Sequence, residues 1–201
     1  GGCICMIEGE IIKFYREKMG LTQAMLGEGI CTTTHVSKIE RGKTAYSADI
    51  INLFSDRLGI NINQEVQTFY NLEKQLHQWH DALIMKKDAQ IEEIKAELEQ
   101  MPFIEYSQYA AHYYLLRARY YFHHQNLVMV NQTINYVLKE FQELSTYEKN
   151  LFYHLQGMYY IQINSSLSNE DHQMAIKILK KIDINEYRNE EYYYHLAIDY
   201  H

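Results

Sequence analysis

The segment from Leu21 to Gly42, which reads LTQAMLGEGICTTTHVSKIERG, limits the possible folds of this chain more than any other. It contains two short helical patterns, and Gly29 lies in the break between them. Thr22 precedes the first pattern and Thr32 or Thr33 begins the second; a threonine hydroxyl there can accept a hydrogen bond from a free backbone N–H group. Glycine favours the left-handed backbone that ends many helices. The segment therefore predicts two short helices joined by a tight turn.

The flanking residues predict further short helices and complete a compact head. Apolar residues at helical spacing indicate a helix over 8–18, and the second helix of the pair is expected over 33–40. Ser47 and Gly59 supply the N-terminal cap and the end of another helix. Two helices joined in this way are typical of a helix-turn-helix, which places the N-terminus of its second helix in the DNA major groove. The sequence thus predicts a DNA-binding head over residues 6–63.

The charge of the chain is unevenly distributed. The net charge is −7, but residues 6–63 hold seven basic and seven acidic residues, and the rest of the chain holds 12 basic and 19 acidic ones. Between Glu28 and Asp49 the only acid is Glu40, and Lys38, Arg41 and Lys43 form a basic edge beside it. We expect a DNA affinity that is modest and sensitive to salt.

Beyond residue 63 the sequence predicts long helices separated by short polar breaks, over roughly 64–86, 88–100, 106–123, 126–144, 147–164, 170–182 and 188–201. Only one proline is present in the chain, which favours an all-α fold. An aromatic residue, a small residue four positions on and a tyrosine three further on share one helical face, and the pattern recurs at intervals of 39 and 40 residues. The three matches are Tyr114–Ala118–Tyr121, Tyr153–Gly157–Tyr160 and Tyr193–Ala197–Tyr200. This part resembles a solenoid of tetratricopeptide-like helix pairs, in which the small residue lets a neighbouring helix approach.

Three domains follow from these patterns. The head spans 6–63, a linker helix and possible dimer helix spans 64–86, and the solenoid spans 87–201. Because the third match stops without a partner helix, we expect either a fragment that is truncated at its C-terminus or a missing helix from another chain.

Residues 9–60 resemble the Xre/Cro-type helix-turn-helix family. The turn is one residue shorter than in most of that family and Cys31 follows Ile30, as in the PlcR/Rgg branch of peptide-responsive regulators, which is grouped as RRNPP. The tetratricopeptide-like part has the same position in that group. The resemblance rests on Gly9, Ile12, Arg16, Leu21-Thr22-Gln23, Leu26, Val36–Gly42 and Leu58-Gly59-Ile60.

The resemblance implies a cytoplasmic, dimeric transcription regulator that binds a palindromic operator and is controlled by a short signalling peptide. Together with the chemistry of the side chains, it assigns base contacts to the start and one face of the second helix of the pair and phosphate contacts to its neighbours. It also implies that Arg16 and Glu40 form an ion pair. The base-contacting residues are Thr33, Thr34, Ser37 and Lys38, and the phosphate-contacting residues are Gln23, Arg41 and Lys43.

A peptide groove is expected on the first helix of each pair in the solenoid. Arg119 can pair with a peptide carboxylate, and Asn126, Asn131 and Asn164 are candidates for holding the peptide backbone. The alternative is that these positions are ordinary solvated helix faces. The peptide-binding residues counted from the repeat are His112, Arg119, Phe122, His154, Met158, Gln162 and Tyr194.

The apolar stripe of the 64–86 helix is open to two interpretations. It either pairs two copies of the chain, as two operator half-sites require, or packs on its own solenoid. The stripe consists of Val66, Phe69, Leu72, Leu76, Trp79 and Leu83.

Several functional classes lack support in the sequence. We expect no enzyme and no cofactor, because no nucleophile grouping, phosphate loop or carboxylate pair is evident. We expect no metal, because His77-x2-His80 and His123-His124 lack further ligands at suitable spacing. Charges interrupt every long apolar run, so no membrane-spanning helix is expected. The alternative functions are a helix-turn-helix repressor whose solenoid binds a protein partner, and an adaptor that does not bind DNA.

Overall fold

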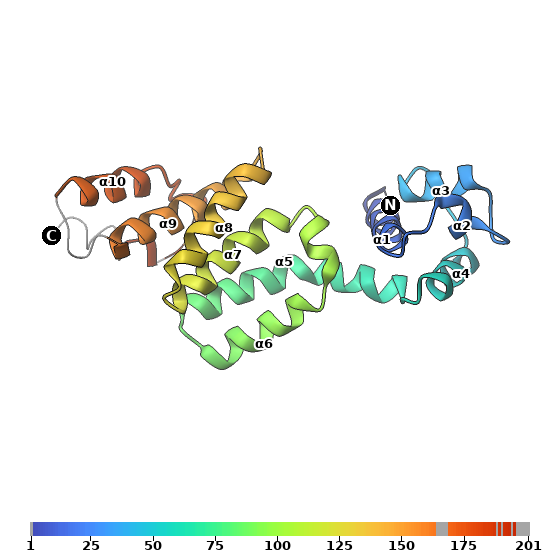
Figure 1. Ribbon diagram of the computed structural model, residues 1–201, viewed down its shortest axis with the longest axis horizontal. Coiled ribbons are helices and arrows are strands. Elements are labelled where there is room, and N and C mark those ends of the chain that lie inside the picture. The colour runs from blue at the N-terminus through green and yellow to red at the C-terminus, as the bar shows by residue number, and fades with distance from the viewer. Residues whose placement is uncertain (1, 164–168, 188, 190, 194, 196–201) are drawn as a thin grey trace. The chain divides into compact units, whose positions relative to one another are not determined.

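A computed structural model describes residues 2–163, 169–187, 189, 191–193 and 195. The described residues form an all-α fold, as predicted, and divide into two compact units, residues 1–74 and 75–201. Helix α5 contributes its first part to one unit and its second part to the other (Figure 1). The elements are α1 (Gly2–Lys18), α2 (Gln23–Gly27), α3 (Thr33–Glu40), α4 (Ala48–Leu58), α5 (Ile62–Ile84), α6 (Asp88–Glu99), the 3₁₀ helix η1 (Pro102–Tyr106), α7 (Ala110–His123), α8 (Leu127–Glu140), α9 (Thr146–Ile163) and α10 (Asn169–Leu179).

The helix caps of the first unit are those that the sequence predicts. The hydroxyls of Thr22, Thr32 and Ser47 accept hydrogen bonds from backbone N–H groups at 3.1, 3.2 and 3.4 Å. Gly29 and Gly59 have φ angles of 70° and 64°, in the left-handed region that glycine adopts without strain. The helix predicted over 8–18 begins earlier, at Gly2.

The core of the first unit forms where α1 and α2 pack against α3. Ile12, Leu26, Val36 and Ile39 are fully buried. Gly9 allows α1 to approach the end of α3 closely, because a Cβ at this position would overlap the main-chain oxygens of Ile39 and Glu40.

Replacing Gly9 with alanine should therefore lower the free energy of unfolding of the first unit by about 2 kcal/mol, since the obstructing atoms belong to the backbone. Urea unfolding of the full chain, followed by circular dichroism, measures this change. Replacing the exposed neighbour Glu10 with alanine is the control and should alter stability by less than about 0.5 kcal/mol. An equal midpoint for the Gly9→Ala chain and the wild type would contradict the close approach.

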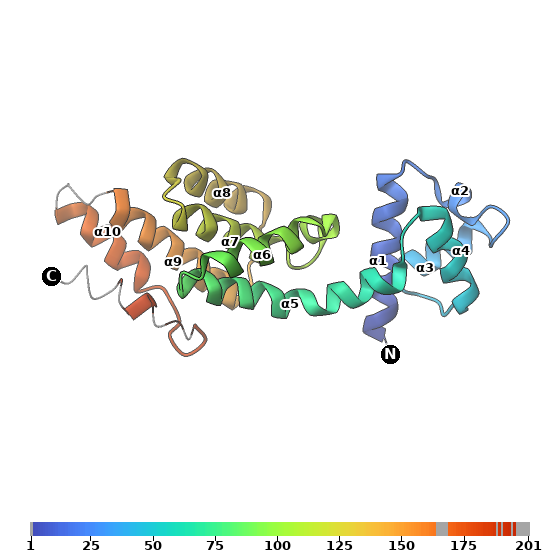
Figure 2. The ribbon, with the colours of Figure 1, turned by 90° about the horizontal axis from the view of Figure 1, so that it is seen from below.

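The second unit consists of helices that pack in consecutive pairs. Helix α7 packs along α8, α9 packs along α10, and α7 also lies beside α9 (Figures 1 and 2).

Two helix boundaries in this unit differ from the predicted ones. One helix was predicted from 106, but η1 and a short bend precede α7, which begins at Ala110. Helix α8 ends at Glu140, before the predicted 144. Most of the helix predicted over 188–201 lies outside the described residues.

The small residues of the repeat are sites of close helix packing. Ala118 on α7 is fully buried. A Cβ added at Gly157 on α9 would overlap the Leu179 side chain of α10, so this glycine sets how near the two helices lie. Tyr114 contacts Tyr136 of α8 with 4.7 Å between ring centroids. Ala197 and Tyr200 of the third match lie outside the described residues.

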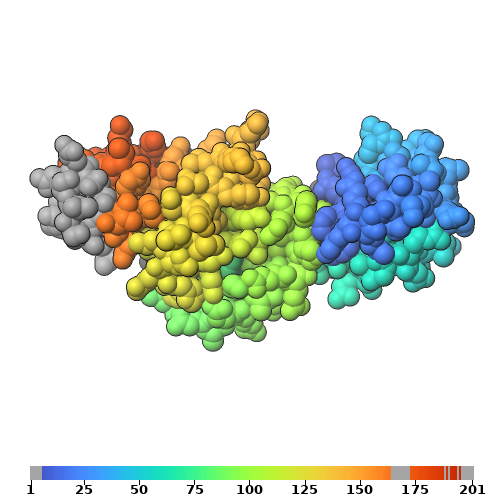
Figure 3. Space-filling view, in the orientation of Figure 1, coloured from blue at the N-terminus to red at the C-terminus, as the bar shows by residue number. Residues whose placement is uncertain are grey.

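The apolar stripe of α5 is buried within a single chain. Its six residues are each at most 6% exposed, and the indole of Trp79 donates a hydrogen bond to the Ile91 carbonyl at 3.1 Å. These side chains therefore stabilise the chain's own fold. Helix α8 lies at the surface of the second unit (Figure 3). Its exposed apolar side chains include Val128 and Leu138.

Candidate nucleic-acid interface and candidate pocket

Helix α3 has one face in the core and one face in solvent. Val36 and Ile39 fix the buried face, and Thr32 caps the N-terminus. Of the predicted base-contacting residues, Thr33, Thr34 and Lys38 are exposed and Ser37 is half-buried. The first turn of α3 thus presents hydroxyls, free backbone N–H groups and, one turn later, an ammonium group on the solvent side.

The ion pair between Arg16 and Glu40 joins α1 to α3, as the resemblance implied. Arg16 Nε and Nη2 donate to the two Glu40 carboxylate oxygens at 2.5 and 3.1 Å, and both residues are buried. The hydrogen bonds to Glu40 raise the pKa of Arg16, so the guanidinium stays charged. Gln23 Nε2 on α2 also donates to Glu40, at 2.8 Å. The carboxylate therefore ties three helices together, and its charge is compensated inside the protein.

The predicted phosphate-contacting residues have different surroundings. Lys43 is exposed. Arg41 is exposed and uses Nε to donate to the Ser37 carbonyl at 3.0 Å, which leaves the ends of its guanidinium for another acceptor. Gln23 is half-buried, and one hydrogen of its amide is used by Glu40. The second amide hydrogen is the one that can reach a phosphate.

The sequence reasoning missed the role of Arg57. Its Nη1 donates to the carbonyls of Leu26 and Glu28 at 2.9 and 2.6 Å. It thereby satisfies acceptors at the C-terminal end of α2 and holds the turn before α3. No local pattern marks this contact, because Arg57 lies about 30 residues further along the chain.

Four of the residues predicted for peptide binding line one pocket in the second unit. This pocket has a volume of about 360 Å³ and combines an apolar surface with basic and amide side chains. The predicted residues among its lining are Arg119, Phe122, Met158 and Gln162, and the others are Lys86, His123, Gln125, Leu127, Glu191 and His195.

The other predicted peptide-binding residues lie elsewhere. His112 and His154 are 5% and 1% exposed and are not among the residues that line the pocket. Burial lowers the pKa of His112 to about 3 and that of His154 well below its ordinary value, so both are neutral interior side chains. Tyr194 and Asn164 lie outside the described residues. Asn126 caps α8, and the side-chain Oδ1 of Asn131 accepts a hydrogen bond from Asn135 Nδ2.

Arg119 already has a carboxylate partner within the chain. Its Nη2 lies 2.6 Å from Glu191 Oε1, and the two side chains are 4% and 15% exposed. Burial raises the pKa of Glu191 although Arg119 acts in the opposite direction. Within the described part of the chain, Arg119 Nε is buried without a hydrogen-bond partner. The sequence holds no signal for this pair, because 72 residues separate its members.

The comparisons with known proteins concern the first unit. Residues 12–64 match the family model of helix-turn-helix domains, a segment that covers α2 to α4, the second part of α1 and the start of α5. This match indicates a DNA-binding transcription regulator. No curated protein and no solved structure matches the chain. Among the residues that the structure describes, no helix has the length and apolar character needed to cross a membrane.

Proposed function

We propose that this chain is a sequence-specific transcription regulator that reads DNA with α3 and is controlled by a short signalling peptide bound in the second unit. The observation that carries the DNA-binding part is the solvent-exposed first turn of α3, within a segment that matches helix-turn-helix domains. The pocket beside Arg119 supports the peptide-binding part.

The exposed face of α3 has the chemistry for reading base edges. Thr33 and Thr34 each offer a hydroxyl group, which suits a polar base edge, and a methyl group, which suits the methyl group of thymine. Lys38 can donate to the N7 and O6 atoms of guanine. Because the head as a whole is neutral, firm binding needs two copies on a palindromic operator with half-sites about 34 Å apart. The proposed regulator is therefore a homodimer.

The DNA-binding proposal is tested with operators selected from random duplexes by the full chain. Replacing Lys38 with alanine should cost about 1–3 kcal/mol on the preferred site and relax preference at one base pair. Replacing Arg41 with alanine should weaken binding to all sequences and reduce the salt slope by about 1. Lys177→Ala makes an equal charge change at an exposed position of α10; it is the control and should leave both unchanged. Wild-type specificity in the Lys38→Ala chain would exclude this residue from base reading.

The pocket of the second unit suits a short peptide with a carboxylate. Phe122, Leu127 and Met158 provide apolar surface, while Gln125 and Gln162 offer amide groups for peptide backbone. Arg119 Nε has no hydrogen-bond partner among the residues that the structure describes, and it is the donor that a ligand carboxylate would use beside Glu191. A peptide that binds one arrangement of the dimer more tightly than another shifts the population toward the first arrangement. The size of the shift is limited by the difference between the two affinities.

Native mass spectrometry of the full chain, incubated with peptides extracted from the expressing host, identifies the ligand. Lys86→Glu reverses a charge on the pocket lining at an exposed position, so the chain should fold and bind the peptide at least about tenfold more weakly. Lys149→Glu on α9 makes the same change away from the pocket and should bind like the wild type. Equal affinity of the two variants would contradict the assignment of the pocket. Capture of a folded protein would favour a repressor controlled by a protein partner.

A further inference from the structure

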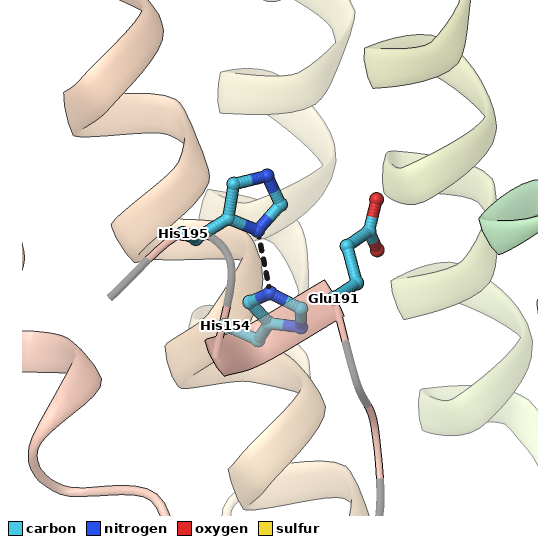
Figure 4. A group of neighbouring side chains, drawn as sticks. All are labelled: His154, Glu191 and His195. Atoms are coloured by element: carbon cyan, nitrogen blue, oxygen red, sulfur yellow. Dashed lines mark hydrogen bonds between the residues drawn. The ribbon is translucent and has the colours of Figure 1, made fainter. Parts of the chain in front are cut away.

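Three side chains that ligate metals in other proteins meet in the second unit. His154 comes from α9, and Glu191 and His195 come from one helical turn, four residues apart, so they project from the same side of that turn (Figure 4). One ligand atom from each residue lies within 4.8 Å of the other two. His154 Nε2 is 3.0 Å from His195 Nδ1.

Neighbouring groups orient these side chains in the manner of outer contacts around a metal. His154 Nδ1 lies 2.9 Å from the Tyr187 hydroxyl, which also accepts a hydrogen bond from Asn189 Nδ2 at 3.0 Å. The Arg119 guanidinium holds Glu191 Oε1 at 2.6 Å. In metal sites such contacts fix which atom of each ligand faces the ion. In this cluster, the contacts with Tyr187 and Arg119 leave His154 Nε2 and Glu191 Oε2 as the atoms that can face an ion.

The second oxygen of Glu191 gives an independent indication of a missing ligand. Glu191 Oε2 is buried and has no hydrogen-bond partner in the described part of the chain. A buried carboxylate oxygen without a donor is costly, because it has lost its water and gained nothing in exchange. A bound cation would satisfy this atom.

We propose that His154 Nε2, His195 Nδ1 and a carboxylate oxygen of Glu191 form a binding site for a divalent transition-metal ion of the Zn²⁺ class. Zn–N bonds of 2.0–2.1 Å in a tetrahedral shell place two nitrogens about 3.3 Å apart. The observed 3.0 Å separation therefore needs to widen by only a few tenths of an ångström. Each imidazole binds as a neutral tautomer, with His154 Nδ1–H donating to Tyr187, and the fourth position is left for water.

The charges around the site set the expected strength of binding. Arg119 compensates the charge of Glu191, so the ion gains little net attraction from the pair. We therefore expect a dissociation constant in the micromolar range, weaker than that of a closed thiolate site. Glu191 and His195 also line the proposed peptide pocket. The test of the metal site measures neither DNA reading nor peptide binding.

The test uses the tag-free full chain in which Cys3, Cys5 and Cys31 are replaced by serine, so that no thiolate competes for the ion. Titration with CoCl₂ should give one ion per chain with a visible spectrum of nitrogen and oxygen ligands, and ZnCl₂ should displace it. His195→Gln and Glu191→Gln should each weaken binding at least about tenfold. His124→Gln, which removes an exposed histidine from the same unit, should bind like the wild type.

Absence of a stoichiometric cobalt spectrum in the thiol-free chain, or a spectrum that persists in His195→Gln, would overturn the site. Because Glu191→Gln also disturbs the Arg119 pair, folding of each variant is checked by circular dichroism. X-ray absorption of the zinc-loaded thiol-free chain decides the matter without these variants. Two imidazole ligands with oxygen donors support the proposal, and any shell with fewer than two imidazoles contradicts it.

Discussion

Replacing Arg16 with methionine is expected to lower the free energy of unfolding of the first unit by about 3–5 kcal/mol. Methionine retains most of the volume but leaves the Glu40 carboxylate, which is 5% exposed, without its bidentate partner. Among the described residues, Gln23 Nε2 is then the remaining donor to that carboxylate, and one neutral donor does not replace a guanidinium. Amide hydrogen exchange of residues 8–40 in the full chain, read by mass spectrometry, measures the loss.

Glu17 provides a matched control for this change. It is the second carboxylate near Arg16, at 3.3 Å, but its side chain is 56% exposed. Glu17→Gln should therefore change stability by less than about 1 kcal/mol. If Arg16→Met were as mild as Glu17→Gln, the contact between α1, α2 and α3 at Glu40 would contribute little to stability.

Replacing Arg119 with methionine should lower the free energy of unfolding of the second unit by about 3–5 kcal/mol at neutral pH, because Glu191 is left charged and buried. The double change Arg119→Met with Glu191→Met removes both charges and should recover most of this loss. Urea unfolding of the full chain, followed by tyrosine and tryptophan fluorescence, compares the three proteins. A double variant as unstable as the single one would mean that packing, and not charge, dominates the effect.

The loss in the Arg119→Met chain should depend on pH. Burial raises the pKa of Glu191, and Arg119 lowers it in part, so removing Arg119 raises the pKa further. A carboxyl group whose pKa is higher in the folded than in the unfolded state stabilises the folded state at pH values below its pKa in the unfolded state. This contribution is lost as the pH rises through the pKa of the folded state. The cost of Arg119→Met should therefore grow with pH and shrink in acid. A cost that does not change with pH would contradict an ionised Glu191 at neutral pH.

The parts of the fold that depend on neighbouring residues were predictable from the sequence. The caps at Thr22, Thr32 and Ser47 and the turn at Gly29 each depend on a few adjacent positions. The same holds for the exposed face of α3, since helical periodicity alone separates it from the buried face.

The side chains of the second unit were harder to predict, because their surroundings depend on contacts between distant helices. Counting along one helix placed His112 and His154 on an open groove, but α7 packs against α8, α9 and η1 and leaves His112 no open side. His112 instead contacts Tyr147 with 5.0 Å between ring centroids. The cluster of His154, Glu191 and His195 was invisible for a related reason, since 41 residues separate the two histidines.

The division of α3 into two faces has a consequence for how such a regulator changes over time. Val36, Ile39 and Glu40 hold the helix in place, while Thr33, Thr34 and Lys38 contribute little to the core. Mutations on the exposed face can therefore accumulate without a loss of stability that would remove them. Under the proposed DNA-reading role of α3, a lineage carrying this head is free to drift between operators, and varying these three positions should retarget it.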